Sequence, residues 1–297
     1  MITPATVPLP GQLQSLMDTP GVREIMVGGD GAVWIEGEHG LRRVGSIAPE
    51  HVSLAIEQIT RFSGRRVDMT SPIVDARLPD GSRACVVLPP VAVDGPTVCI
   101  RRFGGSVLPL AAFTDDVTAR ALRALVSARR NIIVSGATSS GKTTLLGSLV
   151  AGVSTRERLV VVEDTAELSL DHPHVVRLQT RPGTADGVGT VTARDLVRAS
   201  MRLRPDRIIV GEVRGGEAVD MLLALTSGHE GCMATVHARS PQDALDRLVM
   251  LALRDNPQFG ARTLRSLVDR AVDAVVHVER DTRGSRRIVA VTGADCG

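Results

Sequence analysis

The segment "NIIVSGATSSGKTTLLGSLV", residues 131–150, decides the fold of the domain that contains it. It opens with a short β-branched run typical of a buried strand. It closes with a helical pattern whose apolar positions are Leu145, Leu146, Leu149 and Val150. Between the two, "GATSSGKTT" at 136–144 fits G-x-x-x-x-G-K-[ST]. A strand, a glycine-bounded loop and a helix in this order predict a phosphate-binding loop.

The residues of this loop are suited to a nucleotide. Gly136 and Gly141 let the backbone turn so that its N–H groups face the β-phosphate, and the helix N-terminus adds its dipole. Lys142 supplies a positive charge to the β- and γ-phosphates, and Thr143 supplies a hydroxyl to Mg²⁺. We therefore expect ATP with Mg²⁺ to be bound by Gly136, Ala137, Thr138, Ser139, Ser140, Gly141, Lys142, Thr143 and Thr144.

The composition is that of an ordinary globular protein. The 297 residues suffice for two domains, and 43% of them are hydrophobic and 23% charged. A net charge of +2 gives no indication of a nucleic-acid-binding face. Lys142 is the only lysine among 35 basic residues. This indicates that its position needs a compact ammonium rather than a planar guanidinium.

The spacing of the cysteines and the lack of a signal-peptide pattern indicate a protein of a reducing compartment. The chain has four widely spaced cysteines without a C-x-x-C pair, which argues against a disulfide framework or a zinc module. The first residues lack a signal-peptide pattern, and no apolar run reaches the ~18 residues of a membrane span. We expect a cytoplasmic protein without a membrane span, with peripheral association at the inner face of the plasma membrane as an alternative.

The chain is expected to divide into a small α+β domain and a larger α/β domain. Residues 1–104 contain predicted hairpins and a helix at 49–63, and residues 105–112 form a linker. From 113 to 297 strands alternate with helices, which predicts a mostly parallel sheet covered on both faces.

Acidic residues follow two predicted strands of the larger domain. Glu163 and Asp164 end one strand, and Glu212 ends the strand of "RIIVGEVRGGEA", residues 207–218. Because ligands of open parallel sheets bind at the carboxyl ends of the strands, these acids are expected to orient Mg²⁺ or the attacking water. The alternatives are that Glu163 and Asp164 only cap the next turn and that Glu212 is a solvated surface residue.

Two histidines flank a third strand. They are His229 and His237, in "GHEGCMATVHA" at 228–238. Beside an ATP site they suggest a γ-phosphate sensor or a subunit contact. Metal ligation together with Cys232 is conceivable, but the spacing matches no zinc pattern. A structural role for either histidine is the remaining alternative.

These motifs resemble the motor ATPases of type II and type IV secretion and pilus systems, most closely the tight-adherence (Flp) pilus branch. The resemblance covers nearly the whole chain. The N-terminal signature is "SGRRVDMTSPIVDARLPDGSRACVVLPPVAVDGPTVCIRRF" at 63–103. The loop at 136–144 is similar to the Walker A box, 160–168 to the Asp box, and "GHEGCMATVHA" to the His box. "RPDRIIVGEVRGGEA" at 204–218 is similar to the family's Walker B box, in which Gly-Glu replaces the usual aspartate.

The resemblance implies a RecA-like P-loop NTPase domain and roles for individual residues. Glu163, Glu212, His229 and His237 would be catalytic, and Thr143, Glu163 and Glu212 would hold the metal. The N-terminal domain would contribute nucleotide-binding arginines, for which the candidates are Arg77, Arg83, Arg101 and Arg102. In a chain this rich in arginine, ordinary surface positions are the equal alternative for these four.

The resemblance also implies an assembly and a task. We expect a hexameric ring that works with an inner-membrane platform protein and powers pilus assembly or protein secretion. One departure concerns the loop, where Ser139 stiffens a position that the family usually gives to glycine, so we expect an altered nucleotide affinity. A conjugative or DNA-translocating ATPase of the same fold and a weakly hydrolysing nucleotide-binding regulator are the alternatives.

Overall fold

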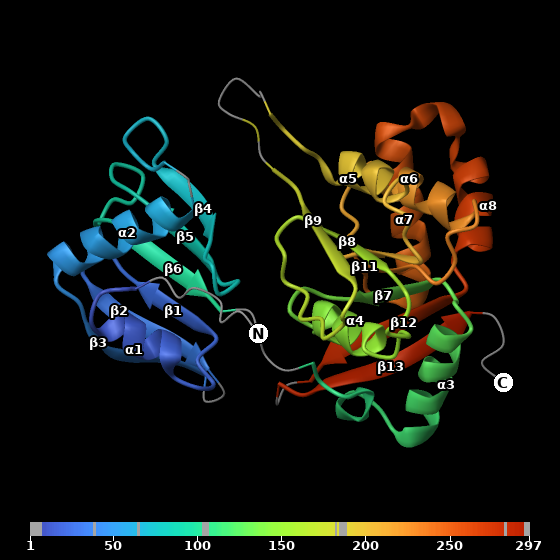
Figure 1. Cartoon of the computed structure of the whole chain (residues 1–297), viewed down its shortest axis with the longest axis horizontal. Helices are drawn as coiled ribbons and strands as arrows, with labels where there is room; N and C mark the ends of the chain where they lie inside the picture. The colour runs from blue at the N-terminus through green and yellow to red at the C-terminus, as the bar shows by residue number, and fades with distance from the viewer. Residues whose placement is uncertain are drawn as a thin grey trace. The chain divides into compact units, whose positions relative to one another are not determined.

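The computed structural model describes residues 8–37, 40–63, 66–102, 107–181, 183, 189–281 and 284–293. The chain forms two compact units, Met1–Gly105 and Ser106–Gly297 (Figure 1). No helix in these ranges is long and apolar enough to cross a membrane.

The first unit is an antiparallel sheet with two helices on one face. Every second residue of the strands at 73–77, 83–87 and 97–101 is buried, and these residues pack with Leu13 and Met17 of one helix and Ile56 and Ile59 of the other. The strand order is β3-β2-β1-β6-β5-β4. The elements are α1 (Gln12–Asp18), β1 (Glu24–Val27), β2 (Ala32–Gly37), β3 (Gly40–Ser46), α2 (Pro49–Ser63), β4 (Ile73–Arg77), β5 (Arg83–Val87) and β6 (Thr97–Arg101).

The second unit is built on a seven-stranded sheet with the order β13-β12-β7-β11-β10-β8-β9. Among the strand pairs that the structure describes in this sheet, β12 with β13 is antiparallel and the other five are parallel, so the predicted α/β fold with a mostly parallel sheet is confirmed. Its strands are β7 (Ile132–Gly136), β8 (Leu159–Glu163), β9 (Val175–Gln179), β10 (Arg207–Val210), β11 (Met233–His237), β12 (Ala274–Arg280) and β13 (Arg286–Gly293).

Helices cover both faces of this sheet (Figure 1). Alternate strand residues belong to different cores: Ile132 and Val134 of β7 pack with one set of helices, whereas Ile133 packs with the other. Strands buried on both faces read as continuous apolar runs, as the central strands of this chain do. The helices are α3 (Asp116–Ser127), α4 (Lys142–Val150), α5 (Ala193–Ser200), α6 (Glu217–Leu225), α7 (Pro241–Asp255) and α8 (Ala261–Ala271), with short 3₁₀ turns η1 (Leu110–Ala112) and η2 (Pro257–Phe259).

The register of the parallel strands creates one edge where four of them end. His237 at the end of β11 pairs with Gly136 at the end of β7, and Val210 at the end of β10 pairs with Val162 of β8. The loop after β7 and the residues that follow β8, β10 and β11 therefore meet at this carboxyl edge.

Candidate nucleotide-binding site

The loop after β7 has backbone positions that only certain residues fill easily. Gly141 lies immediately before α4 with φ +99°, in the left-handed region that favours glycine. Gly136 lies against the backbone of β12, because a Cβ built on it would be 2.3 Å from the carbonyl oxygen of Val278. The two glycines of the motif are thus required by the conformation and by the packing of the loop.

Ser139 adopts a left-handed conformation with φ +61°. A residue with a Cβ pays ~1–2 kcal/mol for this region of backbone space. The position that carries serine here is therefore one that glycine fills without strain, in agreement with the predicted stiffening. The effect on nucleotide affinity stays a prediction.

Lys142 is buried, with 6% of its surface exposed. Its Nζ donates to the carbonyl oxygen of Ala137 at 2.8 Å and lies 3.3 Å from Nδ1 of His237. Burial lowers the pKa of the Lys142 ammonium, and the carboxylate of Glu212 works in the opposite direction. The charge of the loop is thus held in place by two acceptors before any phosphate binds.

His237 connects the lysine to the acid that ends β10. Its Nε2 lies 2.8 Å from Oε1 of Glu212. Because Nδ1 faces an ammonium, it must accept a hydrogen bond, so the proton of the neutral ring is on Nε2 and is donated to Glu212. Burial lowers the pKa of His237, an effect that Glu212 partly offsets and Lys142 reinforces. The neutral ring is therefore the favoured form at neutral pH.

Glu212 is held from its other side by Arg214. The second carboxylate oxygen accepts from Nη2 of Arg214 at 2.5 Å, and Nη1 of Arg214 lies 3.3 Å from Oδ2 of Asp164. The hydrogen bond to Glu212 raises the pKa of Arg214. A continuous polar chain thus runs from Lys142 through His237, Glu212 and Arg214 to Asp164. Arg214 was not among the predicted site residues, although its position two residues after Glu212 is a signal in the sequence that points to it.

Glu163 is the most buried acid at this edge, with 4% of its surface exposed. Its Oε1 accepts the backbone N–H groups of Glu167 and Leu168, both at 2.8 Å. Its Oε2 accepts no hydrogen bond from the described residues and lies 3.8 Å from Nη1 of Arg177. Burial raises the pKa of the Glu163 carboxyl. One oxygen of Glu163 therefore fixes the following loop, which agrees with the alternative that this residue caps the next turn. The other oxygen can still accept a bond from a ligand.

These residues fit a magnesium ion that is mainly bound by phosphate and water. Mg²⁺ commonly keeps several waters and takes one or two protein oxygens besides the phosphates of its nucleotide. Thr143, in the first turn of α4, and the unsatisfied Oε2 of Glu163 are oxygen donors of the required kind. Across the described part of the chain, no cluster of three or more His, Cys, Asp or Glu side chains could hold a metal by itself.

His229 lies away from the other predicted catalytic residues. It precedes β11, whereas His237 is the last residue of this five-residue strand. At ~3.3 Å per residue, β11 places the two histidines at opposite edges of the sheet. Nδ1 of His229 is buried without a hydrogen-bond partner in the described ranges, and its carbonyl accepts from Sγ of Cys232. The second unit therefore brings together Glu163, Glu212 and His237 at the loop, and leaves His229 at the far edge.

Three of the four predicted arginines form a row in the first unit. Arg77, Arg83 and Arg101 are direct cross-strand neighbours on β4, β5 and β6. They alternate with the buried residues of their strands, so they lie on the face that the helices do not cover. Within this face Arg83 pairs with Asp75 at 3.1 Å and Arg101 with Glu24 at 3.3 Å.

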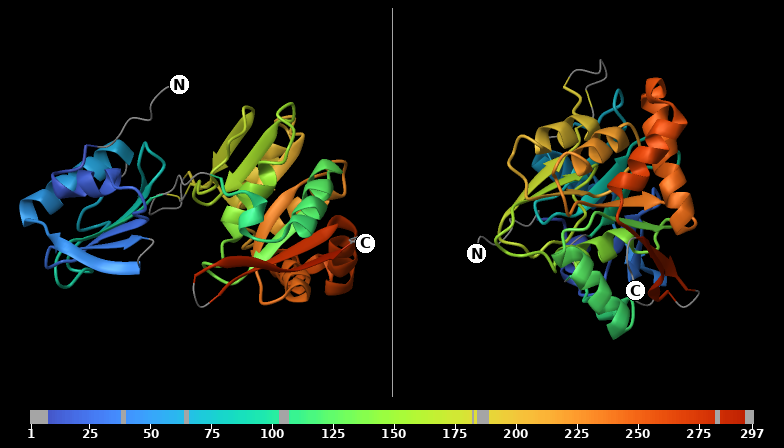
Figure 2. Two further views of the ribbon diagram at one scale, coloured as in Figure 1. Left: turned by 90° about the horizontal axis from the view of Figure 1, so that it is seen from below. Right: turned by 90° about the vertical axis from the view of Figure 1, so that its right-hand side faces the viewer.

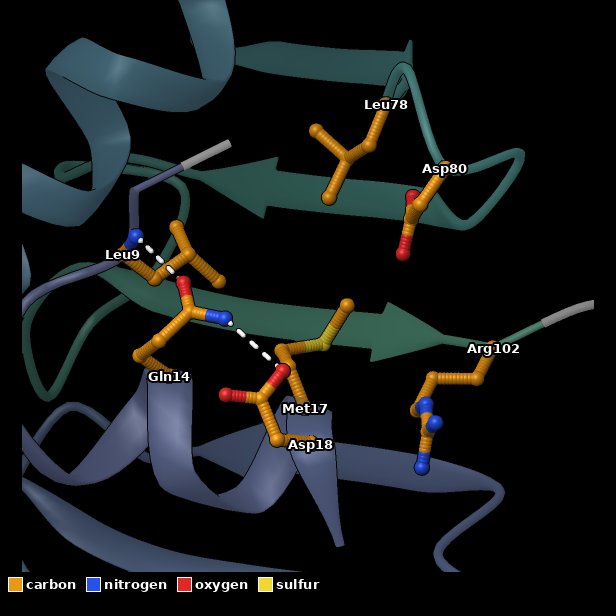
Figure 3. A pocket seen from close by; sticks show the side chains of 7 residues that line it. All are labelled: Leu9, Gln14, Met17, Asp18, Leu78, Asp80 and Arg102. Carbon is orange, nitrogen blue, oxygen red and sulfur yellow. Dashed lines mark hydrogen bonds between the residues drawn. The ribbon is translucent and has the colours of Figure 1, made fainter. Parts of the chain in front are cut away.

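Arg102 has a structural role in its own unit. Its Nη1 donates to the backbone carbonyls of Thr19 and Val22 at 2.7 and 2.9 Å. It also lines a hollow of about 200 Å³ with Leu9, Gln14, Met17, Asp18, Leu78 and Asp80 (Figure 3). Two carboxylates on its wall make this hollow a poor site for phosphate. It is therefore distinct in chemistry from the loop of the second unit.

Comparison with known proteins identifies the chain. The sequence profile of the family described as "Type II/IV secretion system protein" matches residues 11–286. The chain belongs to this family. It is 38% identical over 294 residues to a Mycobacterium tuberculosis protein named for conjugal transfer, with 95% of this chain and 83% of the relative covered. It is 35% identical over 301 residues to the type IV secretion system protein PtlH of Bordetella pertussis, with 90% and 88% covered.

Solved structures agree with this assignment. The VirB11 ATPase of the Brucella suis type IV secretion system, determined in complex with sulphate, is 30% identical, and the match covers 95% of this chain and 92% of that one with a TM-score of 0.54. The pilus retraction motor PilT with bound ADP shares the fold at 17% identity and a TM-score of 0.68, covering 95% and 82%. A type IV secretion ATPase is thus a structural neighbour of this chain, and PilT shows the shared fold.

Proposed function

We propose that this chain is a Mg²⁺-dependent ATPase whose site is the loop 136–144 and the adjoining carboxyl edge of the sheet. The observation that carries the proposal is the polar chain Lys142–His237–Glu212, which joins the phosphate loop to the acid after β10. The VirB11 ATPase, with 30% identity over almost its whole length, supports this activity.

The proposed mechanism assigns each residue a task. The N–H groups of the loop and Lys142 bind the β- and γ-phosphates, while His237 holds Glu212 through its other ring nitrogen. Glu212, with one oxygen fixed by His237, orients the attacking water and accepts its proton. Arg214 keeps the second oxygen of Glu212 in place until substrate binds.

Magnesium has defined candidates for its protein ligands. Thr143 and Glu163 would hold it, with Glu212 beside its water shell, and when bound it would neutralise the charge that develops on the β- and γ-phosphate oxygens. The raised pKa of Glu163 predicts that the ion binds best above the pH at which this carboxyl loses its proton.

The test compares ATP turnover by the wild type, Lys142→Ala and Glu212→Gln. Lys142→Ala is expected to lose nucleotide affinity, and Glu212→Gln is expected to bind ATP while turnover falls by roughly a hundredfold or more. Arg287→Ala, which changes an exposed residue of β13, is the control that should leave both quantities unchanged. Equal turnover by all four proteins would refute the site.

As a motor, the protein is proposed to act as a hexameric ring on the cytoplasmic side of the inner membrane with a platform protein. Its task would be pilus assembly or protein secretion, with the tight-adherence pilus branch as the narrower assignment carried by the N-terminal signature at 63–103. Arg77, Arg83, Arg101 and Arg102 are the proposed nucleotide-binding arginines of the first unit, and His229 is proposed as a further catalytic residue. Size-exclusion chromatography with light scattering, with and without ATP, tests the ring.

A conjugative motor is the second candidate function. Relatives from Mycobacterium tuberculosis and Rhizobium radiobacter are named for conjugal transfer, the latter at 35% identity over 284 residues. A motor that contacts DNA would bind it with an affinity that falls steeply as salt rises. Absence of salt-dependent DNA binding by the assembled protein would favour protein secretion or pilus assembly. A weakly hydrolysing regulator is favoured only if nucleotide binds and no turnover follows.

A further inference from the structure

The second unit places an arginine against the phosphate loop. Arg286 is the first residue of β13, the edge strand of the sheet (Figure 2), and its Nη1 donates to Oγ1 of Thr144 at 3.2 Å. Its aliphatic part lies on Gly141, because a Cβ built on that glycine would be 2.5 Å from Cδ and 3.0 Å from Nε of Arg286. The guanidinium is therefore held beside the first turn of α4.

This position is electrostatically suited to an anion. A helix N-terminus carries a partial positive charge, which favours acidic side chains and disfavours basic ones. The first turn of α4 nevertheless has Lys142 within it and Arg286 beside it. Two cationic side chains added to the N–H groups of one loop are favourable together when a polyanion binds between them.

The strand order tells which part of the polyanion Arg286 faces. In the sheet, β11, β10 and β8 lie on one side of β7, and β12 and β13 lie on the other. The candidates for γ-phosphate chemistry, His237, Glu212 and Glu163, all come from the first side. Arg286 comes from the second side, so it faces the part of the nucleotide that does not react.

We propose that Arg286 is a nucleotide-binding residue whose guanidinium binds the α-phosphate. This inference rests on the proposed ATPase function. In loops of this kind the backbone N–H groups surround the α- and β-phosphates and the lysine reaches the β- and γ-phosphates. Nζ of Lys142 lies beside His237, on the β11 side of the loop, so the phosphates that it binds lie there, and the α-phosphate is assigned to the opposite side, where Thr144 holds the guanidinium. Because ADP and ATP share this phosphate, Arg286 strengthens binding of both and leaves the chemical step unchanged.

The test measures ADP binding by titration calorimetry, which avoids hydrolysis. Arg286→Ala is expected to weaken ADP about tenfold, the loss of one charge-assisted hydrogen bond. Arg287→Ala is the matched control, since Arg287 is the next residue of the same strand, is exposed and points away from its neighbour. Arg286→Lys, which keeps the charge but loses the planar fork, is expected to lie between the wild type and Arg286→Ala.

A second measurement separates a phosphate contact from a structural one. The two diastereomers of ADP with sulfur at the α-phosphate offer the guanidinium different atoms. The wild type should therefore bind them unequally, and Arg286→Ala should bind them more nearly equally. A residue that only supports the loop would weaken both diastereomers by the same factor, and that result would overturn the α-phosphate assignment.

ADP binding by the wild type, Lys142→Ala and Arg286→Ala shows whether the role of Arg286 fails alone or together with the proposed ATPase function. If Lys142→Ala abolishes ADP binding while Arg286→Ala binds as tightly as the wild type, the ATPase site stands and the role of Arg286 is refuted. If the wild type does not bind ADP, the proposed function and this inference fail together. Thermal unfolding of Arg286→Ala and Arg287→Ala at similar midpoints confirms that the comparison is between folded proteins.

Discussion

Two substitutions of Glu163 are expected to separate its structural contacts from its role in hydrolysis. Glu163→Ala removes both carboxylate oxygens, whereas Glu163→Gln keeps an oxygen that accepts the backbone N–H groups of Glu167 and Leu168. Both remove the negative charge beside the loop. The alanine variant should therefore lose stability and activity, and the glutamine variant should lose activity alone.

The structure sets the size of each effect. An unpaired buried donor costs about 1–3 kcal/mol, and Glu163→Ala leaves two N–H groups without their acceptor. Burial disfavours the charged form of the Glu163 carboxyl, so its removal by the substitution offsets part of this cost. We expect a net destabilisation of roughly 2–3 kcal/mol for Glu163→Ala and less than about 1 kcal/mol for Glu163→Gln. Turnover should fall by roughly a hundredfold or more in both.

The assay combines urea denaturation with ATP turnover at saturating Mg²⁺. Turnover by Glu163→Gln equal to that of the wild type would refute the functional role and leave Glu163 as a contact that fixes the loop after β8. Equal destabilisation of the two variants would instead refute the claim that an oxygen at position 163 stabilises the fold by accepting these two N–H groups, since glutamine retains such an oxygen.

Two further predictions concern stability. Ser139→Gly should raise the free energy of unfolding by ~0.5–1 kcal/mol, because the relief of left-handed backbone strain exceeds the extra backbone entropy that glycine loses on folding. Thr138→Gly, at a residue with an ordinary φ, should lower the free energy of unfolding. Urea denaturation of the two variants checks these signs, and a loss of stability in both would contradict the prediction. Burial lowers the pKa of His237 and of His277, which is hydrogen-bonded to Ser135. The unfolded chain therefore binds protons first as pH falls, so stability should be full above the ordinary histidine pKa of about 6.5 and decline below it. Denaturation at about pH 7.5 and about pH 5.5 measures this slope, which should flatten in His237→Asn/His277→Asn; an unchanged slope would refute the assignment.

Local sequence signals locate most of the residues that the structure gathers at the carboxyl edge of the second unit's sheet. The loop 136–144, Glu163 and Glu212 were predicted because each directly follows an apolar strand, and parallel strands end at one edge. The α/β fold followed from the alternation of strands with helices. The strand β9 and the hairpin β12–β13 were not predicted, since neither carries a distinctive motif.

The residues at this edge that were not predicted are brought there by contacts between segments far apart in the sequence. Arg214 and Asp164 are 50 positions apart, and Arg286 and Thr144 are 142 apart. No spacing rule relates such pairs, because strand order in the sheet brings them together. The grouping of His229 with His237 shows the same limit, since one five-residue strand separates two histidines that are close in sequence.

The central claim is tested most directly by ATP turnover of the purified wild type beside Glu212→Gln, with the oligomer mass of each recorded. The account predicts hydrolysis by a hexameric wild type, and a variant that forms the same oligomer and binds ATP but scarcely turns it over. Equal hydrolysis by the two proteins would contradict the account, because Glu212 would then be only the end of a strand.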